Sequence, residues 1–100
     1  MKKLNDENFG SFVEKGETMI QFSATWCGPC KALTTTLESA PDLRVEVGKI
    51  DIDESPATAA SFGIRAVPTM IVFKDGEVVG RKSGALSLPR INDFLKESLT

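Results

Sequence analysis

Both cysteines of this sequence lie close together, with two residues between them, a spacing at which a pair of thiols can open and close a disulfide. They belong to the segment Trp26-Cys27-Gly28-Pro29-Cys30-Lys31, which also holds the only tryptophan among 100 residues. The apolar segment Met19-Ile20-Gln21-Phe22 precedes it, and helix-forming residues follow it from Lys31 to Glu38. The pattern therefore predicts that a strand ends and a helix begins at the cysteines.

The position of the cysteines at a helix start predicts different roles for them. Side chains three apart on a helix have Cβ atoms about 5–6 Å apart, so a disulfide needs only modest adjustment. The first turn carries unpaired backbone N–H groups and the positive end of the helix dipole, which favour a thiolate at Cys27. We expect Cys27 to be the more exposed, attacking thiol and Cys30 to resolve the mixed disulfide. Pro29 is tolerated in a first turn, and Gly28 leaves the backbone open to a substrate.

Three other interpretations of the cysteine pair are weaker. A zinc site needs about four ligands, whereas this chain has two cysteines and no histidine, so no metal site is predicted. A purely structural disulfide would close so small a loop that it would restrict the unfolded chain little. Two inert core cysteines fit poorly with the Gly-Pro pair between them. Redox exchange remains, as a C-x-x-C pair beside a strand–helix–strand pattern favours.

Length and composition are those of one ordinary globular domain, and we predict a single domain over residues 1–100. Hydrophobic residues make up 41% of the chain and the net charge is −2, so nothing indicates binding to nucleic acid or to a membrane. The first residues, Met1 to Glu7, turn polar at once, without the apolar region of a signal peptide. We therefore expect a cytoplasmic protein, where a reactive cysteine pair is more often catalytic than structural.

Apolar residues at strand and helix periods predict regular alternation of the two kinds of element. The second helix should turn Ala32, Leu33 and Leu37 inward, and Asn5-Asp6 and Ser55-Pro56 should cap the first and third helices. The order of elements predicts a mixed sheet with helices on both faces. The predicted elements are a short edge strand over Met1–Leu4, a helix around Phe9, Phe12 and Val13 that ends at Gly16, a strand over Thr18–Ser23, a helix over Cys30–Ala40, a strand over Leu43–Asp53, a helix over Ser55–Phe62, a strand over Val67–Phe73, a turn at Lys74–Glu77, a strand over Glu77–Ser83, and a helix capped by Ser87 with Ile91, Phe94, Leu95 and Leu99 on its apolar face.

Taken in order, these motifs resemble the thioredoxin family over nearly the whole chain. The resemblance implies the thioredoxin fold, an α/β structure with a central mixed β-sheet of four to five strands flanked by about four helices on both faces. The segments that carry it are Trp26–Lys31, Lys49–Asp53, Phe62–Arg65, Val67–Thr69, Phe73–Gly76 and Gly84–Ser87.

The resemblance also implies a substrate-binding surface around Cys27. It implies that Pro68 is cis and lies against the cysteines, which would expose the backbone of Val67 to pair with an extended substrate. The residue types alone leave other interpretations open: Pro68 as an ordinary edge-strand proline, Trp26 as a core anchor and Gly84 as a turn glycine. With the resemblance, the expected docking surface comprises Trp26, Gly28, Pro29, Val67, Pro68 and Gly84.

One departure from the family pattern bears on the chemistry. In most thioredoxins a buried acid occupies the position of Gln21, beneath the cysteines, paired with a lysine that matches Lys49. Because an amide cannot accept a proton at neutral pH, we expect Cys30 to lose general-base help. Its reaction should then rely on water or on Lys49, or be slower. The alternative is that Gln21 is a polar core residue whose carbonyl satisfies Lys49.

Three further departures lie around the site. Ser23 stands where the family usually has tryptophan, which should leave a more open pocket. Ser83 replaces an aliphatic residue that helps dock substrates, so the range of partners should differ. Thr35 replaces a helix-kinking proline, so the second helix should be straighter.

The predicted function is that of a thiol-disulfide oxidoreductase. We expect a dithiol carrier that reduces protein disulfides by attack of Cys27 and resolution by Cys30, and that a thioredoxin reductase restores. Its partners would be that reductase and disulfide-containing proteins, with the carrier itself a monomer. No bound cofactor is expected beyond the Cys27–Cys30 disulfide, and NADPH would act only through the reductase. Two alternatives stay open: a thioredoxin-fold binding module or accessory subunit, and a disulfide oxidase or isomerase of an exported compartment.

Overall fold

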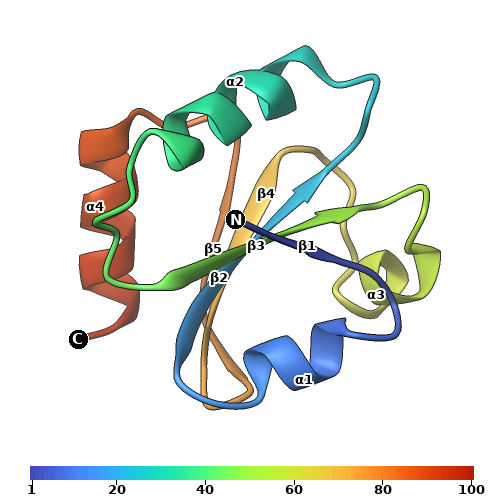
Figure 1. The fold of residues 1–100 in the computed structure, drawn as a ribbon, viewed down its shortest axis with the longest axis horizontal. Helices are drawn as coiled ribbons and strands as arrows, with labels where there is room; N and C mark the ends of the chain where they lie inside the picture. The colour runs from blue at the N-terminus through green and yellow to red at the C-terminus, as the bar shows by residue number, and fades with distance from the viewer.

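A five-stranded mixed sheet forms the centre of the protein in the computed structural model, which describes residues 1–100 (Figure 1). Four helices flank the sheet, and the order of strands and helices is the one that the sequence predicts. The predicted fold class, an α/β structure with a mixed sheet, is therefore confirmed. The elements are β1 (Lys2–Leu4), α1 (Phe9–Val13), β2 (Glu17–Ser23), α2 (Gly28–Glu38), β3 (Glu46–Asp51), α3 (Pro56–Ser61), β4 (Thr69–Lys74), β5 (Glu77–Ser83) and α4 (Leu88–Ser98).

The strand order β1-β3-β2-β4-β5 places β2 in the middle of the sheet. β1 and β2 both run parallel to β3, whereas β4 runs antiparallel to β2 and β5 antiparallel to β4. In this register Gln21 of β2 lies between Lys49 of β3 and Met70 of β4. The carboxyl end of the central strand, Ser23, leads directly into the cysteine segment, where sheets of this kind commonly place their reactive groups.

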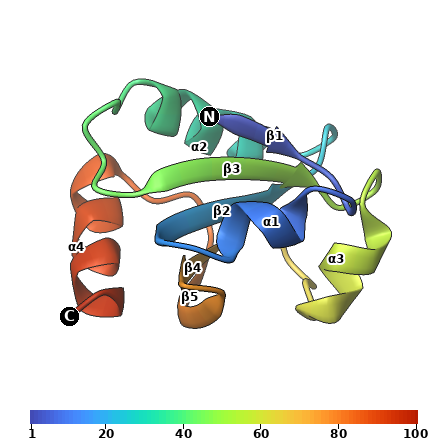
Figure 2. The ribbon, with the colours of Figure 1, turned by 60° about the horizontal axis from the view of Figure 1, so that its bottom comes forward.

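Helices cover both faces of the sheet, with α2 and α4 on one face and α1 and α3 on the other (Figure 2). Successive residues of a strand point to opposite faces, so β2 contributes to both cores. Met19 packs in one core with residues of α2 and α4, and Ile20 and Phe22 pack in the other with residues around α1. The second core is rich in phenylalanine, with rings of Phe9 and Phe73 in edge contact at 5.6 Å between centroids.

Some element boundaries differ from the prediction. A strand ends where its neighbouring strand ends, even if the apolar alternation of the sequence continues. β3 ends at Asp51 because β2, its neighbour, ends at Ser23 in the paired register, although the apolar alternation continues to Asp53. The Asp51 carboxylate then accepts the N–H groups of Asp53 and Glu54 and turns the chain away from the sheet. α2 begins at Gly28, earlier than predicted, and leaves Ala32 exposed, so the inward position predicted for Ala32 is wrong.

Of the two predicted caps for the first and third helices, the one at Asn5-Asp6 is wrong and the one at Ser55 is confirmed in position. Asn5 accepts the N–H groups of Glu7 and Asn8 in a turn that precedes α1, rather than in the helix itself. The Asp6 carboxylate instead accepts the N–H and hydroxyl of Thr58, at 2.9 and 2.7 Å, in the first turn of α3, which is distant in sequence. Ser55 is the N-cap residue of α3 and Pro56 follows it in the first turn, as predicted, but the Ser55 side chain forms no cap hydrogen bond. The hydroxyl and then the amide of Thr58 hold the pKa of the Asp6 carboxyl below its ordinary value of 3.8.

The hairpin between β4 and β5 agrees with the sequence. Asp75 and Gly76 both adopt positive φ, 50° and 85°, as a tight two-residue turn requires. β5 spans Glu77–Ser83, as predicted, and forms one edge of the sheet. α4 follows Ser87 and buries Ile91, Phe94 and Leu95, which confirms its predicted apolar face.

Candidate functional site

The two cysteines lie at the amino end of α2 and form a disulfide, with Cα atoms 5.3 Å apart. Cys27 is the N-cap residue, with extended backbone, and Cys30 lies within the first turn. The backbone N–H of Cys30 points at the Sγ atom of Cys27 across 3.1 Å. Pro29 fits this turn because it removes an N–H that the helix leaves unpaired. An amide directed at Sγ stabilises negative charge there, which matches the thiolate expected at Cys27.

Burial distinguishes the two sulfurs less than the sequence suggests. Cys27 is 5% exposed and Cys30 is 2% exposed, so both residues are buried and the difference between them is small. They pack with Ala24 in a small apolar cluster that Ile52 and Val67 partly cover. The asymmetry of the pair therefore comes mainly from the helix N–H groups around Cys27 rather than from its exposure.

The loop before β4 lies directly against the cysteines. The Val67–Pro68 peptide bond is cis, as the family resemblance implies, and Pro68 is buried. The carbonyl oxygen of Val67 lies 3.7 Å from Sγ of Cys27. The carbonyl of Pro68 accepts the N–H of Gly84 at 2.8 Å, and Gly84 adopts a positive φ of 95° that favours glycine. The structure thus brings together segments that lie about forty and about sixty residues apart.

Trp26 is the most exposed large apolar side chain beside the site, at 68%. This exposure argues against the core-anchor interpretation. Its indole Nε1 donates to Oδ2 of Asp53 at 2.9 Å, and this bond holds the ring at the rim of the site. Gly28 and Pro29 are exposed as well, and nothing lies within 4 Å of the position that a Cβ on Gly28 would take. The residues predicted to form the docking surface therefore lie around Cys27.

Gln21 lies beneath the cysteines and is completely buried. Its Nε2 group donates to the carbonyl of Cys30 at 3.0 Å, and its Oε1 atom accepts the hydroxyl of Thr34 at 3.2 Å. Both ends of the amide are thus occupied within α2. Lys49 pairs with Gln21 in the register but forms no hydrogen bond with it, so the interpretation that the Gln21 carbonyl satisfies Lys49 is wrong.

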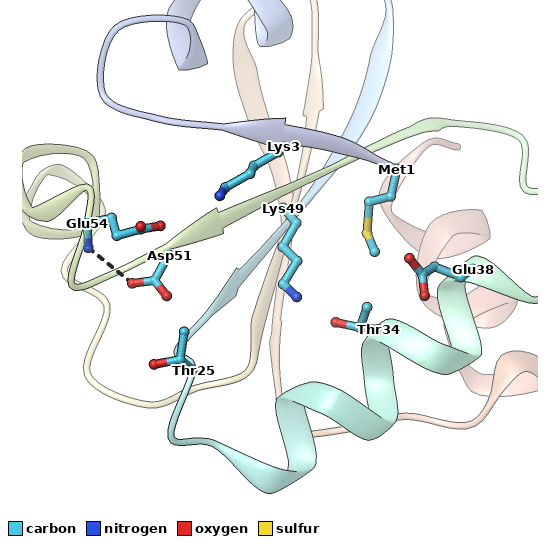
Figure 3. A pocket seen from close by; sticks show the side chains of 8 residues that line it. All are labelled: Met1, Lys3, Thr25, Thr34, Glu38, Lys49, Asp51 and Glu54. Atoms are coloured by element: carbon cyan, nitrogen blue, oxygen red, sulfur yellow. Dashed lines mark hydrogen bonds between the residues drawn. The ribbon is translucent and has the colours of Figure 1, made fainter.

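Lys49 is half-buried and borders two polar cavities, of about 310 and about 280 Å³. The larger one reaches Cys30, and we name it the Cys30 cavity. The smaller one extends to Lys3 and Glu38 and is shown in Figure 3, where the side chains of Lys49 and Asp51 point from β3 toward α2. The only salt bridge of the protein joins Arg44 and Glu17, so the ammonium of Lys49 has no directly paired carboxylate.

Sequence reasoning missed two side chains of the site. Thr34 lies four residues after Cys30, on the same face of the helix, so helical spacing could have indicated it. Asp53 follows the end of β3, and nothing in the local pattern connects it to Trp26. No cluster of three or more potential metal-ligating side chains occurs. No helix combines the length and apolarity needed to cross a bilayer.

Comparisons with known proteins agree with one another. The family model described as Thioredoxin matches residues 1–97. A thioredoxin of Chlamydia caviae is 48% identical to this chain, over 84% of the chain and 84% of its own length. Thioredoxins of Staphylococcus haemolyticus and Staphylococcus aureus are 44% and 45% identical, each over 97% of this chain and 96% of its own length.

Proposed function

Given that the chain belongs to the thioredoxin family and is a thiol-disulfide oxidoreductase, we propose that it reduces protein disulfides through Cys27 and Cys30 in fixed, unequal roles. The observation that carries these roles is the N–H of Cys30, which points at Sγ of Cys27 from the first turn of α2. It stabilises charge on Cys27 and none on Cys30. Cys27 is therefore the nucleophile and Cys30 the resolving thiol.

The reaction has two exchange steps. In the first, the thiolate of Cys27 attacks a substrate disulfide, forms a mixed disulfide and releases one substrate sulfur as a thiolate, which takes a proton from solvent. In the second, Cys30 loses its proton and its sulfur attacks Sγ of Cys27. The bond between Cys27 and the substrate breaks, the second substrate thiol leaves, and the protein retains the Cys27–Cys30 disulfide that the structure contains.

Substrate docking is proposed to use the backbone of Val67. Its carbonyl lies beside Cys27, and its N–H forms no hydrogen bond with another backbone group. An extended substrate segment can satisfy both groups by pairing with this loop, in the manner of a β-strand addition. The exposed ring of Trp26 and the side-chain-free backbone at Gly28 and Gly84 give the segment apolar contact and room.

Gln21 and Lys49 are proposed to act on the resolving thiol without a buried acid. Gln21 fixes the carbonyl of Cys30 and therefore the first turn of α2, but it neither accepts nor releases a proton. Lys49 borders the Cys30 cavity, and its positive charge favours the Cys30 thiolate. Resolution then depends on water and on Lys49 and is slower than with an acid at position 21.

The cellular cycle is a proposal based on the family. Disulfide-containing proteins are the substrates and a reductase restores the dithiol, as membership of the family suggests in general. We propose further that the electrons come from NADPH through a thioredoxin reductase, that the carrier acts as a monomer and that it works in the cytoplasm. The alternative of a binding module with dispensable cysteines is not favoured, since the named relatives are thioredoxins.

A coupled assay with a thioredoxin reductase tests this proposal. The protein, with insulin as the disulfide substrate, should support consumption of NADPH, and Cys27→Ser should abolish it. Cys30→Ser should still form the mixed disulfide but release it only when an external thiol is added. Persistent turnover in the Cys27→Ser, Cys30→Ser double variant would contradict the carrier function.

A further inference from the structure

The resolving step needs a proton acceptor, and the structure offers one that the sequence did not indicate. This inference rests on the function proposed above, in which Cys30 is the resolving thiol. Cys30 is almost completely buried, and its neighbour Gln21 cannot take its proton. Cys30 borders the Cys30 cavity, which has room for water beside this otherwise buried residue.

Among the residues that border the Cys30 cavity, Asp51 is the only one with a carboxylate. Asp51 is the last residue of β3 and pairs with Ser23 of β2, while Lys49, two residues earlier, pairs with Gln21. Alternate residues of a strand share a face, so Lys49 and Asp51 lie on the same face of the sheet as Gln21, the register partner of Lys49. Figure 3 shows both side chains pointing from β3 toward α2.

The carboxylate of Asp51 is fixed in place yet still free to act. Its Oδ1 atom accepts the N–H groups of Asp53 at 2.8 Å and of Glu54 at 3.0 Å. Its Oδ2 atom forms no hydrogen bond within the protein. A general base acts within hydrogen-bond reach of the proton or through water, and Asp51 is a fixed carboxylate on the same cavity that Cys30 borders.

We propose that Asp51 accepts the proton of Cys30 through water during the resolving step, in place of an acid at position 21. The S–H bond of Cys30 breaks as its sulfur bonds to Sγ of Cys27, and the substrate sulfur leaves as a thiolate. The proton passes through water to Asp51 and then to solvent. Lys49 stabilises the transient charge on Cys30. The other charged side chains that border the two cavities are Lys3, Lys31, Glu38 and Glu54.

The test separates the two exchange steps with an aromatic disulfide whose released thiols are coloured. Attack by Cys27 releases the first coloured thiol and resolution by Cys30 releases the second. In Asp51→Asn the second release should slow about tenfold or more near neutral pH, with a pH profile displaced to alkaline pH, while the first release keeps its rate. Asparagine retains an Oδ1 acceptor for the turn, so this variant keeps the hydrogen bonds of Asp51.

Two further variants make the test specific. Glu54→Gln removes a neighbouring charge that borders the smaller cavity and not the Cys30 cavity, and it should leave both releases unchanged. Adding Gln21→Asp to Asp51→Asn should restore the second release, because it supplies an acid next to Cys30.

Two results would overturn the inference alone. One is a wild-type protein that releases both thiols while Asp51→Asn does so with the same rates and pH profile. The other is an equal slowing by Glu54→Gln, which would indicate a general effect of charge. If the wild-type protein releases only the first thiol, the proposed function fails, and the inference with it.

Discussion

Helices α2 and α3 begin with a similar local sequence pattern, but the hydrogen bonds that cap their amino ends come from different places. The cap of α2 is local and that of α3 is remote in sequence. Both have a polar or sulfur-bearing residue followed closely by a proline in the first turn. At α2 the cap is local, since Cys27 accepts the N–H of Cys30. At α3 the side chain of the N-cap residue Ser55 forms no cap bond, and Asp6, about fifty residues earlier in the chain, supplies the acceptor.

The carboxyl end of α3 is completed from a distance as well. Arg81 of β5 donates to the carbonyl of Phe62 and, at 3.2 Å, to that of Gly63. α3 has only six residues, too few to be stable without tertiary support. A helix that must present a reactive sulfur carries its own cap, whereas a helix that only covers the sheet relies on its neighbours.

The largest effect is expected at Cys27, which both caps α2 and carries the reactive sulfur. Two substitutions of Cys27 distinguish these roles. Cys27→Ser and Cys27→Ala should both abolish disulfide reduction, because neither side chain forms a thiolate. Under reducing conditions serine should keep the cap bond, and alanine should lose about 1 kcal/mol of unfolding free energy relative to serine. Insulin reduction and urea denaturation measure the two effects. Equal stability of the two variants would show that the local cap contributes nothing.

A smaller effect on rate is expected beneath the same helix. Gln21→Asp should accelerate the resolving step about tenfold at neutral pH, since it places a proton acceptor next to Cys30. The rate of substrate release from the mixed disulfide is the measurement, with Gln21→Glu as a control of different length. An unchanged rate in Gln21→Asp would mean that proton removal does not limit resolution.

Asp6→Ala should destabilise the protein without changing the chemistry of the cysteines. It removes the remote cap of α3, so the melting temperature should fall by a few degrees while the rate of Cys27 alkylation stays the same. Asp6→Asn keeps one acceptor oxygen, so its melting temperature should lie between those of the wild-type protein and Asp6→Ala. If the rate of Cys27 alkylation changed together with the melting temperature, α3 and the cysteines would be coupled.

The cap of α3 should also depend on pH. The folded-state pKa of Asp6 lies below its ordinary value of 3.8, so well above pH 3.8 the carboxyl is ionised in both the folded and the unfolded state and contributes its full stabilisation. The contribution is lost as the pH falls through the lower, folded pKa. The difference in unfolding free energy between the wild-type protein and Asp6→Ala should therefore shrink in acid, as denaturation over a pH series would reveal. A constant difference would contradict this linkage.

The smallest effect is expected at the carboxyl end of α3. Arg81→Met removes the guanidinium from the carbonyls of Phe62 and Gly63 but retains an apolar stem, and it should cost about 0.5–1 kcal/mol because the site is exposed. Arg81→Lys should recover part of this loss. If Arg81→Met lowered the unfolding free energy more than Asp6→Ala does, the main support of α3 would lie at its carboxyl end.

Local patterns predicted the elements because each one depends on neighbouring residues. The helix start at the cysteines, the turn at Asp75-Gly76 and the apolar face of α4 each follow from residues within a few positions of one another. The end of β3 and the exposure of Ala32 were predicted wrongly. Both depend on where a partner strand stops or a neighbouring layer covers a helix, which no local period contains.

The sequence by itself indicated the chemistry of this protein, because two thiols one helical turn apart at the start of a helix can open and close a disulfide. Only the tertiary structure decided what surrounds them: Val67 against Cys27, Asp53 on Trp26, Asp51 on the Cys30 cavity and Asp6 on α3. These contacts join residues on different strands and loops. Their distances depend on the order of the strands and on how the helices pack against the sheet. The local sequence around a carboxylate does not indicate which distant N–H group or sulfur it will lie beside.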